Sequence, residues 1–364
     1  MTTLALHEVH EALGARFAEE RGCEVVADYG DAFAEHTALR KAAAVVDLSF
    51  RGRLCLLGAD RVRLLNGQVT NDVKALVAGR GCHAAFCSPK GRLVSDAYVY
   101  SLAQELLLDF EPGLTAALTQ RLEHHIVAED VQVVDVAPHY GLFSVQGPRA
   151  AEVLARLELF APLPADALAF VSASDPTLGD LYAMNRSRAG FPGVDLFVPA
   201  DALGAVFDKL VAAARDCGGQ VAGFTALEWA RFEAGVPRFG VEMDETNLPP
   251  EAGLDRDAIS YSKGCYTGQE TIARVRTYGS VTKALRGLRL PAGITELPRK
   301  GTKLFRDGRE VGQIVNALWS PALGANLALG YVRKECNQPG TEVSFENAGQ
   351  PATATVQALP FRPG

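Results

Sequence analysis

The sequence predicts an α+β fold that ends in a small β-barrel, and three observations support this. Strands precede and follow single helices, but strict strand–helix–strand units are too few for a doubly wound parallel sheet. From residue 283 onward, short apolar runs alternate with Gly, Pro and Asn-Ala-Gly turns, which is typical of a barrel of roughly 80 residues. The length of 364 residues, with 48% hydrophobic and 22% charged, suits two or three globular units.

The N-terminal elements are predicted from periodicity and capping residues. Apolar residues recur at spacings of three and four, which predicts an amphipathic helix over the first twenty residues, ending near Gly22. These apolar residues are Leu6, Val9, Leu13 and Phe17. The apolar run at residues 53–57 predicts a strand, and Asp60 is placed to cap the helix that follows it.

The middle of the chain predicts a hairpin and then further strands and helices. Pro and Gly within residues 88–91 form a strong turn signal between two apolar segments, which indicates an antiparallel hairpin. Helices are predicted at residues 114–125, from Pro148, at 200–217 and at 269–276, and strands at 131–136, 141–145 and within 170–197. The last domain boundary is expected near Tyr278, Gly279 and Ser280.

Charge and cysteine usage exclude several classes of protein. A net charge of −7 excludes a protein that binds nucleic acid over its whole surface. Residues 271–309 nevertheless carry ten basic and two acidic residues, a net +8, which indicates either attraction of an anionic ligand or a solvated face. Seven scattered cysteines without a Cys-x-x-Cys pair predict free thiols in a reducing compartment.

Targeting and motif signals are largely negative. With no signal peptide and no apolar run of about 18 residues, we expect a cytoplasmic protein without a membrane span. Neither His7 with His10 nor Cys82 with Cys87 has the geometry or the third ligand of a metal site. The phosphate-binding, dinucleotide-binding and esterase motifs do not occur.

Residues 260–270 are the richest candidate for chemistry. Cys265 lies between two glycines, just before a predicted helix and near Lys263. A helix N-terminus and a neighbouring cation both lower the pKa of a thiol. The alternative is a buried structural cysteine in a glycine-shaped turn.

Two other segments could form a site. Residues 66–72, which include Asn71, gather amide and carboxyl side chains around one apolar residue, although helix capping and turns could also explain this pattern. Asp96 lies on the second strand of the hairpin among apolar residues. A carboxylate there needs a partner, either a protein donor or the ring nitrogens of a ligand.

Residues 263–270 read K-G-C-Y-T-G-Q-E and resemble the K-G-C-Y-x-G-Q-E signature of the YgfZ-type folate-binding proteins, which are related to the glycine-cleavage T-protein, an aminomethyltransferase. Residues 66–73, 83–92 and 231–237 also resemble motifs of that family. The resemblance implies a T-protein-like ring of two interleaved α+β domains and a C-terminal β-barrel around an opening that holds tetrahydrofolate. It implies domains at 1–50 with 141–280, at 51–140 and at 281–364.

The resemblance also implies functional residues. Its catalytic group would be Cys265, Lys263 and Asp96, and the folate contacts would be Asp96, Asn71, His83, Tyr98, Arg231, Tyr266 and Gln269. Three departures from the T-protein stand out: Ser95 in place of the first acid of an Asp-Asp pair, Phe191 in place of an acid and Leu227 in place of an arginine.

Three functions follow as hypotheses. The first is a tetrahydrofolate-binding accessory factor that supports Fe–S clusters in client enzymes, including tRNA-modifying ones, through Cys265. The second is a folate-dependent aminomethyltransferase in which Asp96 orients or deprotonates the amine. The third is an RNA-interaction module that uses the basic stretch and binds in a salt-dependent manner, although the acidic net charge argues against direct nucleic-acid binding.

Overall fold

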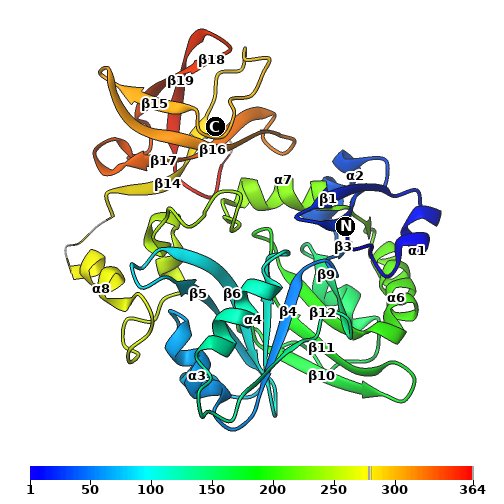
Figure 1. Ribbon diagram of the computed structural model, residues 1–364. Coiled ribbons are helices and arrows are strands. Elements are labelled where there is room, and N and C mark those ends of the chain that lie inside the picture. The colour runs from blue at the N-terminus through cyan, green and yellow to red at the C-terminus, as the bar shows by residue number, and fades with distance from the viewer. Residues whose placement is uncertain (278, 280, 363–364) are drawn as a thin grey trace.

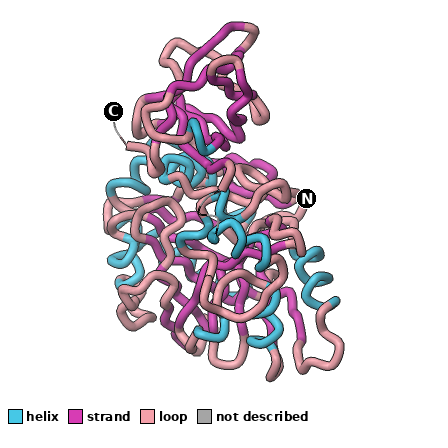
Figure 2. Tube along the Cα trace, turned by 90° about the vertical axis from the view of Figure 1, so that its left-hand side faces the viewer, coloured by secondary structure: helices cyan, strands magenta, loops and turns pink. Residues whose placement is uncertain are grey.

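The computed structural model describes residues 1–277, 279 and 281–362 (Figure 1). Two sheets and their helices form a body, and a closed β-barrel from the C-terminal part of the chain stands above it in both views (Figures 1 and 2). The predicted α+β fold with a C-terminal barrel is confirmed. The expected boundary near residues 278–280 falls partly on residues 278 and 280, which lie outside the described residues.

The first sheet of the body is assembled from two distant segments of the chain. Its strand order is β10-β11-β12-β9-β3-β13. The strands are β3 (Ala44–Asp47), β9 (Tyr140–Gln146), β10 (Phe170–Asp175), β11 (Gly179–Asn185), β12 (Gly193–Pro199) and β13 (Gln220–Val221). Strand β3 pairs antiparallel with β9, so the chain leaves this sheet after β3 and returns to it at β9. Helices α5 (Ala150–Ala155) and α6 (Leu203–Asp216) pack on it through a buried apolar core.

The second sheet is formed by the segment between β3 and β9. Its order is β5-β6-β7-β4-β8. The strands are β4 (Gly52–Leu57), β5 (Arg80–Cys87), β6 (Leu93–Ser101), β7 (Leu106–Phe110) and β8 (Gln132–Asp135). Helices α3 (Arg61–Gln68) and α4 (Thr115–His124) cover one face. We propose that residues 1–50 with 141–280, 51–140 and 281–364 are the domains of this arrangement.

The predicted long N-terminal helix is wrong. Helix α1 spans only His7–Ala12, and the chain then forms a hairpin of β1 (Arg16–Glu20) and β2 (Cys23–Asp28). Gly14 has a left-handed backbone with φ of 81°, which ends a helix. The pairing of β1 with β2 therefore overrides the helical spacing of the apolar residues.

Three more helices complete the body. They are α2 (Ala32–Lys41), α7 (Phe224–Ala234) and α8 (Gln269–Thr277). Short 3-10 helices span Val73–Ala75, Ala200–Ala202, Pro249–Ala252, Leu254–Arg256 and Lys334–Cys336. None of the helices in the described part of the chain is long and apolar enough to span a bilayer.

The barrel closes in the order β14-β17-β16-β15-β18-β19. Its strands are β14 (Lys283–Arg289), β15 (Lys303–Arg306), β16 (Arg309–Ser320), β17 (Ala325–Arg333), β18 (Glu342–Asn347) and β19 (Gln350–Gln357). A buried hydrogen-bond group fastens it to the body: Glu233 of α7 accepts from Ser320 of β16 and contacts His36 of α2 at 3.0 Å. The barrel is thereby held against the helices that flank the centre of the molecule.

Candidate functional site

A row of polar side chains crosses the second sheet on the face opposite α3 and α4. His83 of β5 is the register partner of Tyr98 on β6, and Tyr98 is the register partner of Asp109 on β7. Asp96 shares this face because side chains of a strand alternate, whereas Ala97 and Val99 point into the apolar core. The hairpin of β5 and β6 therefore has one polar face, and its opposite face packs into the apolar core with α3 and α4.

Asp96 and Asp257 bind the two nitrogens of the same imidazole. His83 Nε2 lies 2.9 Å from Asp96 Oδ2, and His83 Nδ1 lies 3.2 Å from Asp257 Oδ2. Burial opposes protonation of this ring, but interaction with Tyr98 and the two carboxylate hydrogen bonds outweigh it and raise the pKa of His83 well above its usual value. This shift favours the imidazolium, which donates to both carboxylates.

Tyr98 is held between two cationic groups. The His83 ring stacks on it with a centroid separation of 4.3 Å and an interplanar angle of 2°, and the Arg186 guanidinium carbon lies 3.3 Å from its centroid. Two groups this close cannot share one face, so they lie on opposite faces of the tyrosine. Only the edge and the hydroxyl of Tyr98 remain for a ligand.

A buried ion cluster lies behind this row. Asp109 is fully buried and accepts hydrogen bonds from Arg51, Arg186 and Arg188. Burial alone would raise the pKa of Asp109, but the three arginines outweigh it and hold that pKa far below its usual value. These residues were not predicted from the sequence, although an aspartate inside the apolar run Leu106–Phe110 indicates a buried ion pair.

The polar face opens into two adjoining spaces. A cleft of about 60 Å³ is lined by Asp96, Tyr98 and Arg186, together with the apolar Leu227. A cavity of about 730 Å³ is lined by His83 and Tyr98 of the body and by barrel residues that include Arg286. Tyr98, Val236 and Pro237 line both spaces, so the cleft and the cavity meet there.

Asn71 supports this site through the backbone. Its side-chain amide donates to the carbonyls of His83 and Asp257, each at 2.8 Å. Thr70, its neighbour, donates to the carbonyl of Ala258 at 2.6 Å. Residues 66–72 therefore tie strand β5 to the segment that carries Asp257.

The motif at residues 263–270 divides into an inward and an outward part. Lys263 Nζ donates to the carbonyls of Asn66, Val69 and Asn71 at 2.6, 2.8 and 2.7 Å. Burial lowers the pKa of Lys263 to about 8. Tyr266 is also buried, with its ring 5.0 Å from the same ammonium.

Cys265 lies on the outer side of this motif. Cys265 is exposed to solvent, so the alternative of a buried structural cysteine is wrong. The Lys263 ammonium donates its three hydrogen bonds to backbone carbonyls, so it has none left for the Cys265 thiol. Neither Cys265 nor Gln269 is among the residues that line the cleft or the cavity, so the structure does not bring them together with Asp96.

Arg231 lines the cleft but is fully engaged. Its five N–H groups donate to Glu228, Glu242 and the carbonyl of Val236. A guanidinium has five donors, so Arg231 has none left for a ligand in this arrangement.

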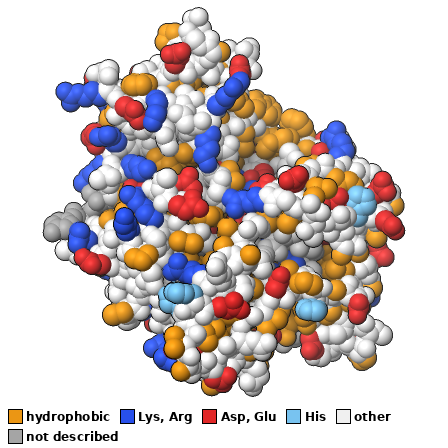
Figure 3. Space-filling model, in the orientation of Figure 1, with side chains coloured by type: hydrophobic (Ala, Val, Ile, Leu, Met, Phe, Trp, Pro, Cys, Tyr) orange, Lys and Arg blue, Asp and Glu red, His pale blue; other side chains and the backbone are white. Residues whose placement is uncertain are grey.

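The basic stretch is spread over α8 and the barrel. Lys and Arg side chains stand separately on the face shown, with acidic side chains among them (Figure 3). Arg274 pairs with Glu270, and Arg299 pairs with Glu296. Most of this stretch is a solvated face. Arg286 is the basic residue of the stretch that lines the cavity.

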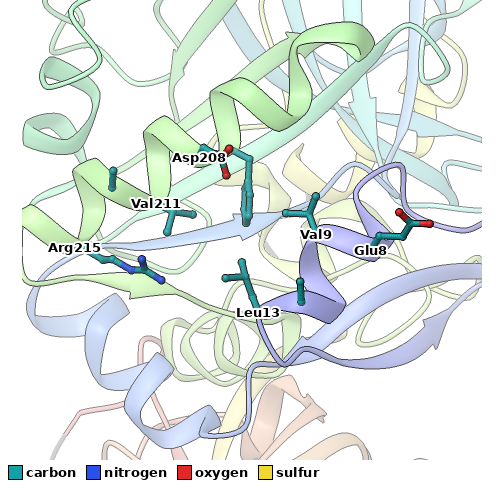
Figure 4. A pocket seen from close by; sticks show the side chains of 9 residues that line it. Glu8, Val9, Leu13, Asp208, Val211 and Arg215 are labelled. Atoms are coloured by element: carbon teal, nitrogen blue, oxygen red, sulfur yellow. The ribbon is translucent and has the colours of Figure 1, made fainter.

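A separate groove of about 440 Å³ lies between α1 and α6 (Figure 4). Val9 and Leu13 face Val211 across it, with Glu8 and Arg215 at its ends. None of the predicted site residues lines this groove. In the described part of the chain, no group of three or more His, Cys, Asp or Glu side chains is placed to hold a metal ion.

Comparisons with known proteins agree with this architecture. The family model described as GCVT N-terminal domain matches residues 6–263, and the model described as glycine cleavage T-protein C-terminal barrel domain matches residues 283–362. An aminomethyltransferase of Saccharopolyspora erythraea is 30% identical over 98% of this chain and 96% of its own length. One of Symbiobacterium thermophilum is 29% identical with the same coverage of 98% and 96%.

A solved structure has the same fold. The glycine cleavage system aminomethyltransferase T from Bartonella henselae superposes with a TM-score of 0.88 at 24% identity, covering 99% of this chain and 98% of that chain. The T-protein-like fold predicted from the sequence is thereby confirmed, whereas the narrower YgfZ-type assignment is not confirmed. The chain belongs to the glycine cleavage T-protein family.

Proposed function

We propose that this protein is a folate-dependent aminomethyltransferase in which Asp96 is the catalytic carboxylate. One observation carries the proposal: Asp96 is a largely buried carboxylate, held on one oxygen by His83, that lines a cleft joined to a large cavity. The curated relatives named aminomethyltransferase add support. They favour the enzyme over the Fe–S accessory factor that the cysteine motif predicted first.

The residues present fit tetrahydrofolate. The cavity of about 730 Å³ lies within the usual range for small-molecule sites, about 300–1,000 Å³. Its lining combines apolar residues such as Leu254 with Arg256 and Arg286, and guanidinium groups suit the carboxylates of a glutamate tail. Tetrahydrofolate would supply the nitrogen that receives the one-carbon unit.

The wall of the cleft differs from the T-protein pattern. Leu227 lies where that family carries an arginine, and it lines the cleft together with Phe224. Phe191, in place of an acid, does not line the cleft and packs against an apolar core shared by the two sheets. We infer that the ring system of the folate is held here by apolar contact and by Asp96.

Asp96 can act on the amine with one oxygen. Among the described residues, only its Oδ2 has a hydrogen-bond partner, which leaves Oδ1 to accept an amine N–H. Such a carboxylate orients the amine or takes its proton, and general-base assistance contributes about 10²–10⁴-fold to a rate. The buried ion cluster behind Tyr98 binds Arg186, which lines the same cleft.

The test measures methylenetetrahydrofolate formed from tetrahydrofolate and an aminomethyl donor. Asp96→Asn keeps the shape of the side chain and should lower kcat by at least about 100-fold. Asp135→Asn, an exposed aspartate on the same sheet, is the matched control and should keep the wild-type rate. Absence of product with the wild-type protein, or equal rates for both variants, would contradict the proposal.

A second candidate is the YgfZ-type accessory role in Fe–S protein maintenance. The observation that favours it is the exposed thiol of Cys265 within the K-G-C-Y-T-G-Q-E motif, away from the cleft. Cys265→Ala should then abolish support of Fe–S client enzymes while folate affinity and aminomethyl transfer stay unchanged. Unchanged client activity in Cys265→Ala would exclude this role.

A further inference from the structure

We propose that His83 is the positioning residue of Asp96 and that Asp257 holds His83 in this role. The three side chains form a chain from the solvent-exposed Asp257 through the imidazole to the catalytic carboxylate. The inference rests on the proposed function of Asp96. It adds a mechanism for keeping that carboxylate turned toward the amine.

The three hydrogen-bonded side chains differ in their exposure to solvent. The Asp257 side chain is 63% exposed on the rim of the cavity, whereas those of His83 and Asp96 are 6% and 13% exposed. Because both imidazole nitrogens face carboxylate oxygens, both must carry a hydrogen for the two contacts to be hydrogen bonds. Asp257 is therefore the member that can be altered from the solvent side with least disturbance of the core.

The imidazole cannot readily turn away from this position. Tyr98 stacks on its face, and Arg186 backs Tyr98 on the opposite side. Asn71 donates to the backbone carbonyls of both His83 and Asp257, which fixes the spacing between them. An imidazole held in this way aligns Oδ2 of Asp96, so Oδ1 keeps one orientation toward the cleft.

The charged groups around His83 favour its protonated form. Asp96 and Tyr98 face it from β6, and Asp257 faces it from the loop after the Leu254–Arg256 turn. Arg186 lies beyond Tyr98, and the carboxylates of Asp96 and Asp257 stand nearer to the ring. The imidazolium in turn is an ion-pair partner of the Asp96 carboxylate, with 2.9 Å between Nε2 and Oδ2.

Two variants test this arrangement in the full-length protein. His83→Gln retains a neutral N–H donor but removes the positive charge. It should lower kcat at least about 10-fold with little change in KM, and it should remove the alkaline limb that deprotonation of His83 gives to the kcat–pH profile. Asp257→Asn should act in the same direction, more weakly, because Asp257 is exposed.

An NMR titration of the imidazole gives a readout that does not depend on turnover. The His83 signal, assigned by its loss in His83→Gln, should titrate well above pH 6.5 in the wild type and about one unit lower in Asp257→Asn. Asp135→Asn is the control and should leave this titration unchanged. A purely structural His83 would lower the melting temperature of His83→Gln but leave the kcat–pH profile unmoved.

The outcomes separate the inference from the proposed function. If the wild type transfers no aminomethyl group, the proposed function fails, and the NMR titration still decides whether Asp257 sets the protonation of His83. If the wild type is active but His83 titrates near pH 6.5 in both proteins, or if both variants keep the wild-type pH profile, the inference is wrong while the function stands. Should His83→Gln fail to fold, Asp257→Asn carries the test alone.

Discussion

Replacing Asp109 by Asn should destabilise the protein by about 3–5 kcal/mol, the usual cost of breaking a buried ion pair. Asp109 has no exposed surface and accepts hydrogen bonds from Arg51 at 2.7 Å, from Arg188 at 3.1 Å and from Arg186. Glu111 and Asp195 also pair with these arginines, and Glu111 pairs with Arg238 as well, so Asp109 belongs to a larger buried network of opposite charges. Asparagine would leave one positive charge uncompensated and away from water.

Differential scanning calorimetry at pH 7 measures this effect. At about 1.3 °C per kcal/mol for a chain of this size, the melting temperature should fall by about 4–7 °C. The control Asp135→Asn, on the same sheet but exposed, should change stability by no more than about 0.5 kcal/mol.

A double variant tests the charge argument itself. Asp109→Asn with Arg188→Gln restores the charge balance of the cluster. Its loss of stability should be smaller than the sum of the two single losses by at least about 1 kcal/mol. If Asp109→Asn melts at the same temperature as Asp135→Asn, or if the two losses simply add, the cluster is not held together by compensation of buried charge.

Three further predictions concern the motif and the imidazole. Lys263→Met should cost about 2–4 kcal/mol by calorimetry, because three buried carbonyls lose their donor, whereas the exposed Lys74→Met should be neutral. Gly268→Ala should destabilise the start of α8 and speed amide hydrogen exchange in this helix. Gly268 has φ of 88°, and an added Cβ would lie 2.6 Å from the Ser88 carbonyl oxygen. Gly264→Ala is the control and should exchange as the wild type does, because nothing lies within 4 Å of an added Cβ at that position. Since the pKa of His83 is raised by folding, its protonation stabilises the protein below pH 6.5, and this contribution is lost as pH rises through the folded-state pKa. The difference in unfolding free energy between wild type and His83→Gln, measured by urea titration from pH 5 to 9, should therefore shrink with rising pH, and a constant difference would contradict a charged His83.

The features that could be predicted from the sequence are those with local signals. The hairpin of β5 and β6 has its turn residues at 88–91 between an apolar run and an alternating segment, and the barrel has short strands separated by turns. The predicted N-terminal helix was too long because the spacing of its apolar residues does not mark where a helix ends. Gly14 and the pairing of β1 with β2 determine that end.

The polar residues of the site were only partly predictable. Asp96 was identified because a carboxylate among apolar strand residues needs a partner. Its partner His83 is 13 positions away across the hairpin, and the partner of His83, Asp257, is a further 174 positions away. Such contacts depend on how distant segments pack, so they cannot be predicted from a local sequence pattern.

The motif at residues 263–270 shows the same division between sequence and tertiary structure. Its residue types alone indicated the family relationship and a cysteine in a glycine-shaped loop, and the alternation of strands and helices alone determined the α+β class. Only the tertiary structure decided that Lys263 binds the carbonyls of Asn66, Val69 and Asn71 and that Cys265 faces solvent. The physical reason is that helix α3 ends at Gln68 and its last carbonyls need donors, and that a buried ammonium must be hydrogen-bonded. Both requirements are met by one contact between segments nearly two hundred residues apart.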